Sequence, residues 1–147
     1  MSQGQGLFIA GTDTGVGKTL VTGLLIARLR ARAMDIGVMK PVETGCPTVA
    51  GRPTPPDATF LRTLASVKDP MSEICPYALS LPAAPAAAAK AEGVTIDLRH
   101  LCRAYRRLAG RHQVVLVEGA GGLMVPLTAA EDYTDLIRAL ALPVLVV

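Results

Sequence analysis

One glycine-rich segment constrains the fold of this chain more than any other. Residues 11–19 read GTDTGVGKT and lie between the apolar run LFIA and the helix-like run LVTGLL. A glycine-rich loop that ends in Gly-Lys-Thr and joins a strand to a helix is typical of phosphate-binding loops. The usual spacing is one residue shorter than the five residues that separate Gly11 from Gly17 here. The segment therefore predicts a strand, a lengthened anion-binding loop and a helix, in that order.

Four short apolar runs rich in β-branched residues are typical of buried parallel strands. They are residues 7–11, 36–40, 114–118 and 143–147. Apolar residues at helical spacing lie between these runs and predict helices. The expected helices are residues 18–33, 57–66 and 97–109. Strands that alternate with helices predict an α/β fold, with a doubly wound, mainly parallel sheet flanked by helices.

The same pattern leads to more local expectations. In the first helix, Leu20 and Leu24 follow helical spacing and are expected on the buried face. Residues 46–56, rich in Pro and Gly, are expected to form a mobile loop. Residues 79–93, with two prolines before an alanine run, are expected to form a loop that leads into a short helix.

Composition and charge narrow the classes of partner. The net charge is only +3, and no basic run is interleaved with aromatic residues, so we expect no nucleic-acid partner. Cys46, Cys75 and Cys102 lack the spacing of a disulfide or metal framework, which favours a reducing compartment and thiols that act as apolar fillers or lie exposed. His100 and His112 are expected on the surface. No apolar run approaches the roughly 18 residues of a membrane helix, so we expect a cytoplasmic protein.

The loop residues indicate a site for Mg²⁺ and ATP. Gly15 and Gly17 allow the backbone to curl so that its N–H groups cradle phosphate oxygens at a helix N-terminus. Lys18 would reach the β- and γ-phosphates, and the Thr19 hydroxyl would bind Mg²⁺, which prefers oxygen ligands. The extra residue is expected to widen the loop beside the γ-phosphate, where a phosphoryl acceptor must lie.

Two carboxylates are candidates for the same metal. Glu118 follows the apolar run VVLV and is expected where a buried strand emerges at the carboxyl edge of the sheet; the alternative is a solvated Glu beyond the strand. The glycines of the following segment, GAGG, would let backbone approach the nucleotide or the metal. Asp57, in TPPDATFLRTLA, precedes a helical run, and by spacing alone a helix N-cap is the favoured role.

Lys40 ends the second apolar run, in GVMKPVETG. A long cation at the carboxyl edge of a buried strand would face the same crevice as the phosphate loop. Together with Lys18 it would place two positive charges around a transferring phosphoryl group. The alternative is a solvated lysine at a strand end.

These motifs together resemble the dethiobiotin synthetase family. The segments GTDTGVGKT, KPVETG and VEGAGG and the position of Asp57 occur in the family's order and at similar separations, over nearly the whole chain. The resemblance implies a ligase that forms dethiobiotin from 7,8-diaminononanoate and CO₂ with ATP and Mg²⁺. In that reaction a carbamate oxygen attacks the γ-phosphate, and the second amine then displaces phosphate from the mixed anhydride. The resemblance also implies a homodimer.

The resemblance assigns roles residue by residue. It implies that Thr14 lies near the carbamate, that Lys40 stabilises the carbamate and the migrating phosphoryl group, and that Thr44 contacts the diamine. It implies that Lys40, Lys18 and Thr14 are the catalytic residues. It also favours a role for Asp57 as a metal ligand over a role as a helix N-cap. The implied metal ligands are Thr19, Asp57 and Glu118. The implied nucleotide-binding residues are Gly15, Val16, Gly17, Lys18, Thr19, Leu20, Asp57, Glu118, Gly119, Ala120 and Gly121.

Two features depart from the family. Ala86 stands where members often carry His, so a substrate contact there would be replaced or lost. The sequence also stops inside its last apolar run, and an unprotected hydrophobic edge strand invites aggregation, so we expect residues 1–147 to be a single ATP-binding P-loop domain truncated at its C-terminus.

Two other functions remain open on sequence grounds. One is an ATP-dependent amidoligase of the cobyrinic acid synthetase type, which carries a downstream glutaminase region. The other is an ATP switch of the partition type, which usually has a second lysine early in its phosphate loop, where Thr12, Asp13 and Thr14 stand here.

Overall fold

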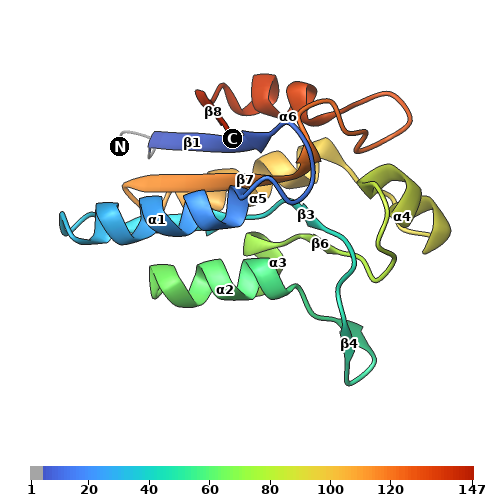
Figure 1. The fold of residues 1–147 in the computed structure, drawn as a ribbon, viewed down its shortest axis with the longest axis horizontal. Coiled ribbons are helices and arrows are strands. Elements are labelled where there is room, and N and C mark those ends of the chain that lie inside the picture. Colours follow the sequence, from blue (N-terminus) through green and yellow to red (C-terminus); the bar gives the residue numbers. More distant parts are fainter. Residues whose placement is uncertain (1–4) are drawn as a thin grey trace.

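A parallel four-stranded sheet forms the centre of the molecule (Figure 1). The structure is a computed structural model, and it describes residues 5–147. The strands of this sheet are β1 (Gln5–Gly11), β2 (Ile36–Met39), β7 (Val114–Gly122) and β8 (Val144–Val146). Their order is β2-β7-β1-β8, and every neighbouring pair is parallel. The four parallel strands expected from the apolar runs are confirmed.

Helices cover both faces of this sheet. They are α1 (Lys18–Arg30), α2 (Pro56–Ala65), α3 (Met71–Ile74), α4 (Pro85–Ala91), α5 (Leu98–Ala109) and α6 (Tyr133–Leu140). Because side chains alternate along a strand, Leu116 packs with the cluster of α1, α2 and α3, whereas Val115 and Val117 pack with that of α4, α5 and α6. The doubly wound α/β class is therefore confirmed. No helix within residues 5–147 is long and apolar enough to cross a membrane.

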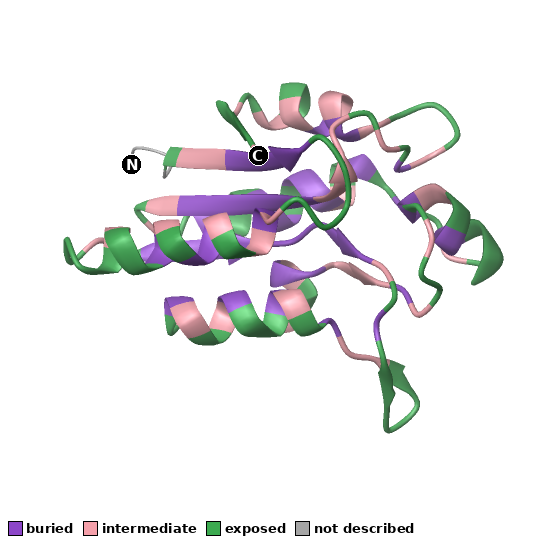
Figure 2. Cartoon of the chain, in the orientation of Figure 1, coloured by how far each residue is buried: buried purple, intermediate pink, exposed green. Residues whose placement is uncertain are grey.

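Within residues 5–147, four short strands lie outside the main sheet. β3 (Val42–Glu43) pairs in parallel with β6 (Tyr77–Ala78). β4 (Thr48–Val49) and β5 (Arg52–Pro53) form an antiparallel hairpin that projects from the body of the molecule (Figure 1). The segment expected as a loop thus contains a hairpin, and its tip is exposed (Figure 2). Residues 79–93 form a loop that leads into α4, as expected.

The expected buried face of α1 is wrong. Leu20 and Leu24 are 67% and 62% exposed, whereas Lys18, Thr22 and Ile26 are buried. Residues four apart share one face of a helix, and residues two apart lie on nearly opposite faces. Because the loop turns Lys18 inward, it fixes the rotation of the helix and leaves both leucines outside.

Parallel pairing places the ends of β1, β2 and β7 at one edge of the sheet. The chain passes from β1 through α1 to β2, and β7 later inserts between these two strands. Such a switch in strand order opens a crevice at the carboxyl edge, where α/β proteins bind their ligands. The fold therefore brings the phosphate loop after β1, Lys40 after β2 and Glu118 of β7 to a single place.

The opposite, amino edge of the sheet carries an ion-pair network. His112 lies with Nδ1 3.0 Å from Asp35 Oδ1 and Nε2 2.7 Å from Asp69 Oδ2, and Arg111 donates to Asp69 at 2.8 Å. The side chain of His112 is only 10% exposed, so the expectation of a surface histidine is wrong. The partners of His112 come from distant segments, which is why the local sequence did not reveal them.

Candidate active site

The lengthened loop folds into an open turn at the start of α1. Gly17 is the N-cap residue, with φ 104°, and Gly15 has φ 73°, both in the left-handed region that favours glycine. No side chain caps this helix end, so its first N–H groups remain free of side-chain partners within the described residues. A Cβ atom added at either glycine would meet nothing within 4 Å. The turn therefore presents open space and free donors to an anion.

Lys18 lies beside this turn without a carboxylate partner in the described part of the chain. Its Nζ donates to the backbone oxygen of Asp13 at 2.7 Å, and the residue is 7% exposed. Burial lowers the pKa of Lys18, and the positive charge of Lys40 lowers it further. The charges of Glu118, Asp13 and Asp57 oppose this lowering. A phosphate that enters here would thus meet a cation that forms no ion pair within residues 5–147.

Lys40 is held by two carboxylates. Its Nζ donates to Glu118 Oε1 at 2.7 Å and to Asp57 Oδ2 at 2.9 Å. Burial alone would lower the pKa of Lys40, but the charges and hydrogen bonds of Glu118 and Asp57 outweigh it, so the pKa is raised. Lys40 is 4% exposed and Glu118 is fully buried, so neither side chain is solvated, contrary to both alternatives.

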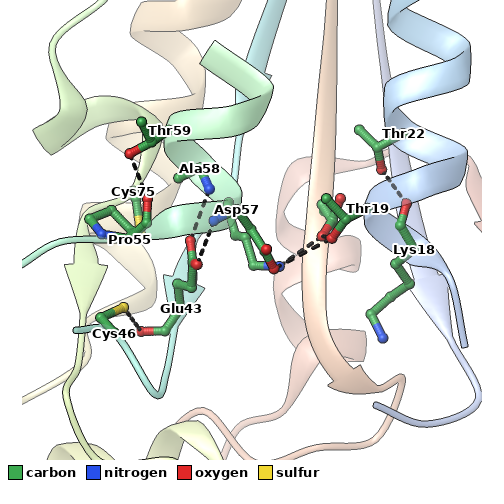
Figure 3. Close-up of polar contacts among 12 residues, drawn as sticks. Lys18, Thr19, Thr22, Glu43, Cys46, Pro55, Asp57, Ala58, Thr59 and Cys75 are labelled. Atoms are coloured by element: carbon green, nitrogen blue, oxygen red, sulfur yellow. Dashed lines mark hydrogen bonds and ion pairs between the residues drawn. The ribbon is translucent and has the colours of Figure 1, made fainter. Parts of the chain in front are cut away.

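The Thr19 hydroxyl completes this cluster. Its Oγ lies 2.7 Å from Glu118 Oε1 and 3.4 Å from Asp57 Oδ2. Figure 3 shows Thr19 of α1 and Asp57 of α2 directed toward one another across the site. Three residues from three separate elements therefore converge with their oxygen atoms, as their expected role as metal ligands requires.

The chemistry of these oxygens fits Mg²⁺. Glu118 Oε2 is buried and has no hydrogen-bond partner among the described residues, so this carboxylate retains a free acceptor. No group of three or more His, Cys, Asp or Glu side chains within residues 5–147 could hold a metal by itself. Two carboxylates and a hydroxyl suit Mg²⁺, which usually takes few protein ligands and completes its shell with phosphate and water oxygens.

Asp57 is not the N-cap that its spacing favoured. α2 begins at Pro56 with Pro55 as its N-cap residue, so Asp57 is the second residue of the helix. Its carboxylate instead contacts Lys40 and Thr19. The helix begins at Pro56, one residue before the expected start at residue 57, because proline suits the first position of a helix. The side chain of Asp57 is therefore available to the site.

A cavity of about 370 Å³ joins the loop to the two lysines. Its lining is Thr14, Gly15, Gly17, Lys18, Thr19, Leu20, Lys40, Glu43, Thr44, Asp57, Glu118, Ala120 and Gly121. Two of the implied nucleotide-binding residues, Val16 and Gly119, lie outside this lining, as does Gly122. Val16 is 37% exposed. Gly119 lies against the ring of Phe8, because a Cβ atom added at Gly119 would be only 3.2 Å from Phe8 Cε1. Gly119 thus lets the strand pass close to that ring.

A second cavity of about 440 Å³ opens beside the first. Thr14, Thr44, Ala120 and Gly121 line both cavities, and the second adds apolar walls from residues 82–85 and Val125. Thr14 and Thr44, the residues expected near the carbamate and the diamine, therefore lie where the charged cavity meets the apolar one.

Ala86 lines neither of these cavities. It lies in α4 and faces a separate groove with Leu127. The departure from the family at this position therefore lies outside the cavity that Lys18 and Lys40 line.

The cysteines of the chain are all buried. Burial raises the pKa of the Cys46 thiol to about 11 and also raises that of Cys75. A thiol that stays protonated is a poor nucleophile. Their interpretation as small apolar residues is confirmed, and exposed thiols are excluded.

Glu43 is the site residue that the sequence did not reveal. It is 4% exposed, and its two carboxylate oxygens accept hydrogen bonds from the backbone N–H groups of Asp57 and Ala58 at 2.8 and 3.0 Å. Burial raises the pKa of Glu43, although these hydrogen bonds oppose the effect. No local pattern predicts a contact between residues so far apart in the sequence.

Comparison with known proteins places this site in context. A family model described as an AAA domain matches residues 5–147. Curated relatives named ATP-dependent dethiobiotin synthetase BioD include those of Anaeromyxobacter dehalogenans (strain 2CP-C), 52% identical, Nitrosospira multiformis, 42% identical, and Thermodesulfovibrio yellowstonii, 39% identical. The matches cover 97%, 100% and 97% of this chain, but 62%, 63% and 62% of the relatives. The chain therefore spans about three fifths of their length. These relatives confirm the resemblance drawn from the motifs.

Proposed function

The chain belongs to the AAA domain family, a family of P-loop NTPases, and on this premise we propose that it acts in an ATP- and Mg²⁺-dependent dethiobiotin synthetase. Its reaction would be the carboxylation and ring closure of 7,8-diaminononanoate. The observation that carries the proposal is the placement of Lys18 and Lys40 on one cavity with a lengthened phosphate loop. That cavity opens beside an apolar one of the size expected for the carbon chain of a small substrate.

The proposed reaction has three bond-forming steps. One amine of the substrate adds to CO₂ and loses a proton, which gives a carbamate. A carbamate oxygen then attacks the γ-phosphorus of ATP, and the bond to ADP breaks. The second amine finally attacks the carbonyl carbon of the mixed anhydride and loses a proton, the C–O bond to phosphate breaks, and the ureido ring closes with release of phosphate.

Electrostatics explains why this chemistry would need two lysines. A carbamate and a triphosphate are both anionic and repel each other when they approach in line. Lys18 beside the loop would bind the phosphate oxygens, and Lys40 would bind the carbamate and the migrating phosphoryl group. Mg²⁺, when bound by Thr19, Asp57 and Glu118, would supply further positive charge for the phosphates. Such positioning requires little covalent participation by the protein.

Substrate orientation is assigned to the junction of the two cavities. By the family resemblance, Thr14 would contact the carbamate and Thr44 the diamine. Both residues line both cavities, which is compatible with these roles. The apolar walls would accommodate the hydrocarbon chain of the substrate. On the family resemblance alone, we further propose CO₂ or bicarbonate as the carbon donor, a homodimer and a cytoplasmic location.

Turnover with a defined product tests the function. ATP hydrolysis would be measured with Mg²⁺ and bicarbonate, with and without 7,8-diaminononanoate, and the product mass would be checked for a ring-closed ureide. We expect phosphate release that depends on the diamine and one ureide for each phosphate. Phosphate release that ignores the diamine, with no ureide formed, would contradict the proposal.

Two variants make this assay specific to the site. Lys40→Met should still bind ATP below its unfolding temperature but form no ureide. Lys68→Met is the matched control, because Lys68 is exposed and lies outside every cavity described above. It should retain the turnover of the unsubstituted protein.

A further inference from the structure

We propose that Glu43 is a positioning residue that directs the carboxylate of Asp57 into the metal site. The inference rests on the proposed function, because it takes Asp57 as a ligand of Mg²⁺. Glu43 acts on the backbone of α2 and not on the metal itself. Its role is to fix the first turn of that helix against the end of β3.

The first turn of α2 depends on Glu43 for its hydrogen bonds. Pro56, the first residue of the helix, has no N–H group, and Pro55 offers no side-chain cap. The first N–H groups of the helix are therefore those of Asp57 and Ala58. Both donate to Glu43, at 2.8 Å to Oε1 and 3.0 Å to Oε2, as Figure 3 shows. A carboxylate at this end also complements the helix dipole.

The backbone of Glu43 is itself fixed. Glu43 ends β3, and its backbone oxygen accepts from Leu79 N at 2.8 Å and from Cys46 Sγ at 3.4 Å. The contact with Leu79 ties Glu43 to the segment that follows β6, and the contact with Cys46 closes the turn after β3. The Glu43 carboxylate that holds α2 is therefore attached to a backbone that is itself hydrogen-bonded. Accurate placement of a site residue requires such support.

Both carboxylate oxygens of Glu43 are occupied by backbone N–H groups. Two backbone donors thus hold this carboxylate against α2 and fix its direction. This geometry separates Glu43 from Glu118, whose Oε2 has no partner within residues 5–147. Glu43 thus positions the first turn of α2, whereas Glu118 still has an oxygen that can bind a ligand.

Asp57 needs such support because little else fixes it. Its side chain is 44% exposed, and its contacts to Lys40 and Thr19 are with groups that would themselves engage ligands. The direction of its carboxylate is therefore set mainly by the backbone of the first turn. A partner that orients a metal ligand in this way commonly changes metal affinity about 10- to 100-fold when removed.

The test is the effect of Mg²⁺ on ATP binding. Dissociation constants for ATP would be measured with excess Mg²⁺ and with EDTA, for the unsubstituted protein and for Glu43→Gln. An amide keeps one acceptor but turns an N–H₂ donor toward a backbone N–H. We expect the constant for Mg·ATP to rise about tenfold or more, and that for ATP in EDTA to change less than about twofold.

A matched control separates this effect from the loss of any carboxylate that accepts from a backbone N–H group. Glu92 Oε1 accepts from Leu81 N at 2.7 Å, in an exposed position outside the lining of the cavity that holds Lys18 and Lys40. Glu92→Gln should leave both dissociation constants unchanged. If Glu43→Gln does not fold, Glu43→Asp carries the same measurement, because it keeps both acceptors on a shorter side chain and shifts the turn.

A double-mutant cycle with Asp57→Asn identifies the route of the effect. If Glu43 acts through Asp57, Glu43→Gln should add less than about twofold to the weakening of Mg·ATP that Asp57→Asn causes. Additive effects, or equal weakening with and without Mg²⁺, would overturn the inference. If the unsubstituted protein shows no effect of Mg²⁺ on ATP binding, the proposed function falls and the inference with it. If it shows that effect and Glu43→Gln retains it, only the inference falls.

Discussion

Lys18 and Lys40 line the same cavity, yet their surroundings shift the pKa values of the two ammonium groups in opposite directions. Lys40 contacts two carboxylates and its pKa is raised, whereas Lys18 contacts a backbone oxygen and its pKa is lowered. A lysine with fixed partners contributes to the stability of the fold. A buried lysine without them costs stability and gains most from an anionic ligand.

The largest expected effect is on stability, at Lys40. Lys40→Met leaves Glu118 fully buried without its cation, and breaking a buried ion pair in this way costs about 3–5 kcal/mol of unfolding free energy. Urea denaturation monitored by circular dichroism would measure the loss. Adding Glu118→Leu should recover most of it, since an apolar replacement of a whole buried pair is often neutral. A double variant no more stable than Lys40→Met would contradict this account.

Lys18→Met should affect turnover strongly but stability little, the opposite of what is expected for the stability of Lys40→Met. The folded protein loses a buried charge that is also repelled by Lys40, so its unfolding free energy should stay the same or rise. Turnover should nevertheless fall about 10²- to 10³-fold, because a donor directed at the transferred phosphoryl group is lost. The same denaturation and phosphate-release assays apply. A loss of stability equal to that of Lys40→Met would erase the proposed difference between the two lysines.

Thr19 allows a finer test, because its hydroxyl lies against the carboxylates that hold Lys40. Thr19→Ala removes one expected metal ligand and should weaken Mg·ATP binding about tenfold, with little effect on ATP in EDTA. Thr19→Ser retains the hydroxyl and is the control. Titration calorimetry would measure each constant, and equal weakening by both substitutions would indicate that the methyl group matters instead.

The smallest expected effect is the dependence of stability on alkaline pH. Because the pKa of Lys40 is raised on folding, its stabilisation is complete below the ordinary lysine value of 10.5 and is lost above it. The stability gap between the unsubstituted protein and Lys40→Met should therefore be constant from pH 8 to 10 and shrink by about 1 kcal/mol near pH 11.5.

Lys18 should follow the reverse course. Its pKa is lowered on folding, so its cost to stability is present at neutral pH and disappears as the pH rises toward 10.5. Denaturation curves of Lys18→Met and the unsubstituted protein should thus converge in that range. A gap that widens with pH for Lys18→Met would reverse the assigned sign.

Much of the fold and part of the site could be predicted because the signals are local. Apolar runs marked the parallel strands, and parallel strands end at one edge, so Lys40 and Glu118 could be assigned to the same crevice. Leu20 and Leu24 were misplaced because spacing gives the period of a helix but not its rotation, which Lys18 fixes. Glu43 and His112 were missed because their partners lie far along the chain, where no periodic pattern connects them.

The hairpin of β4 and β5 has a further consequence for protein engineering. Its segment leaves the body after Glu43 and returns at Asp57, and the hydrogen bonds that Asp57 and Ala58 donate to the Glu43 carboxylate join its ends. Lengthening a loop whose ends are already held together costs little entropy. Ala50 and Gly51, at the exposed tip, therefore mark a position where a peptide tag or a fluorescent label could be inserted while the contacts of Glu43 with α2 are kept.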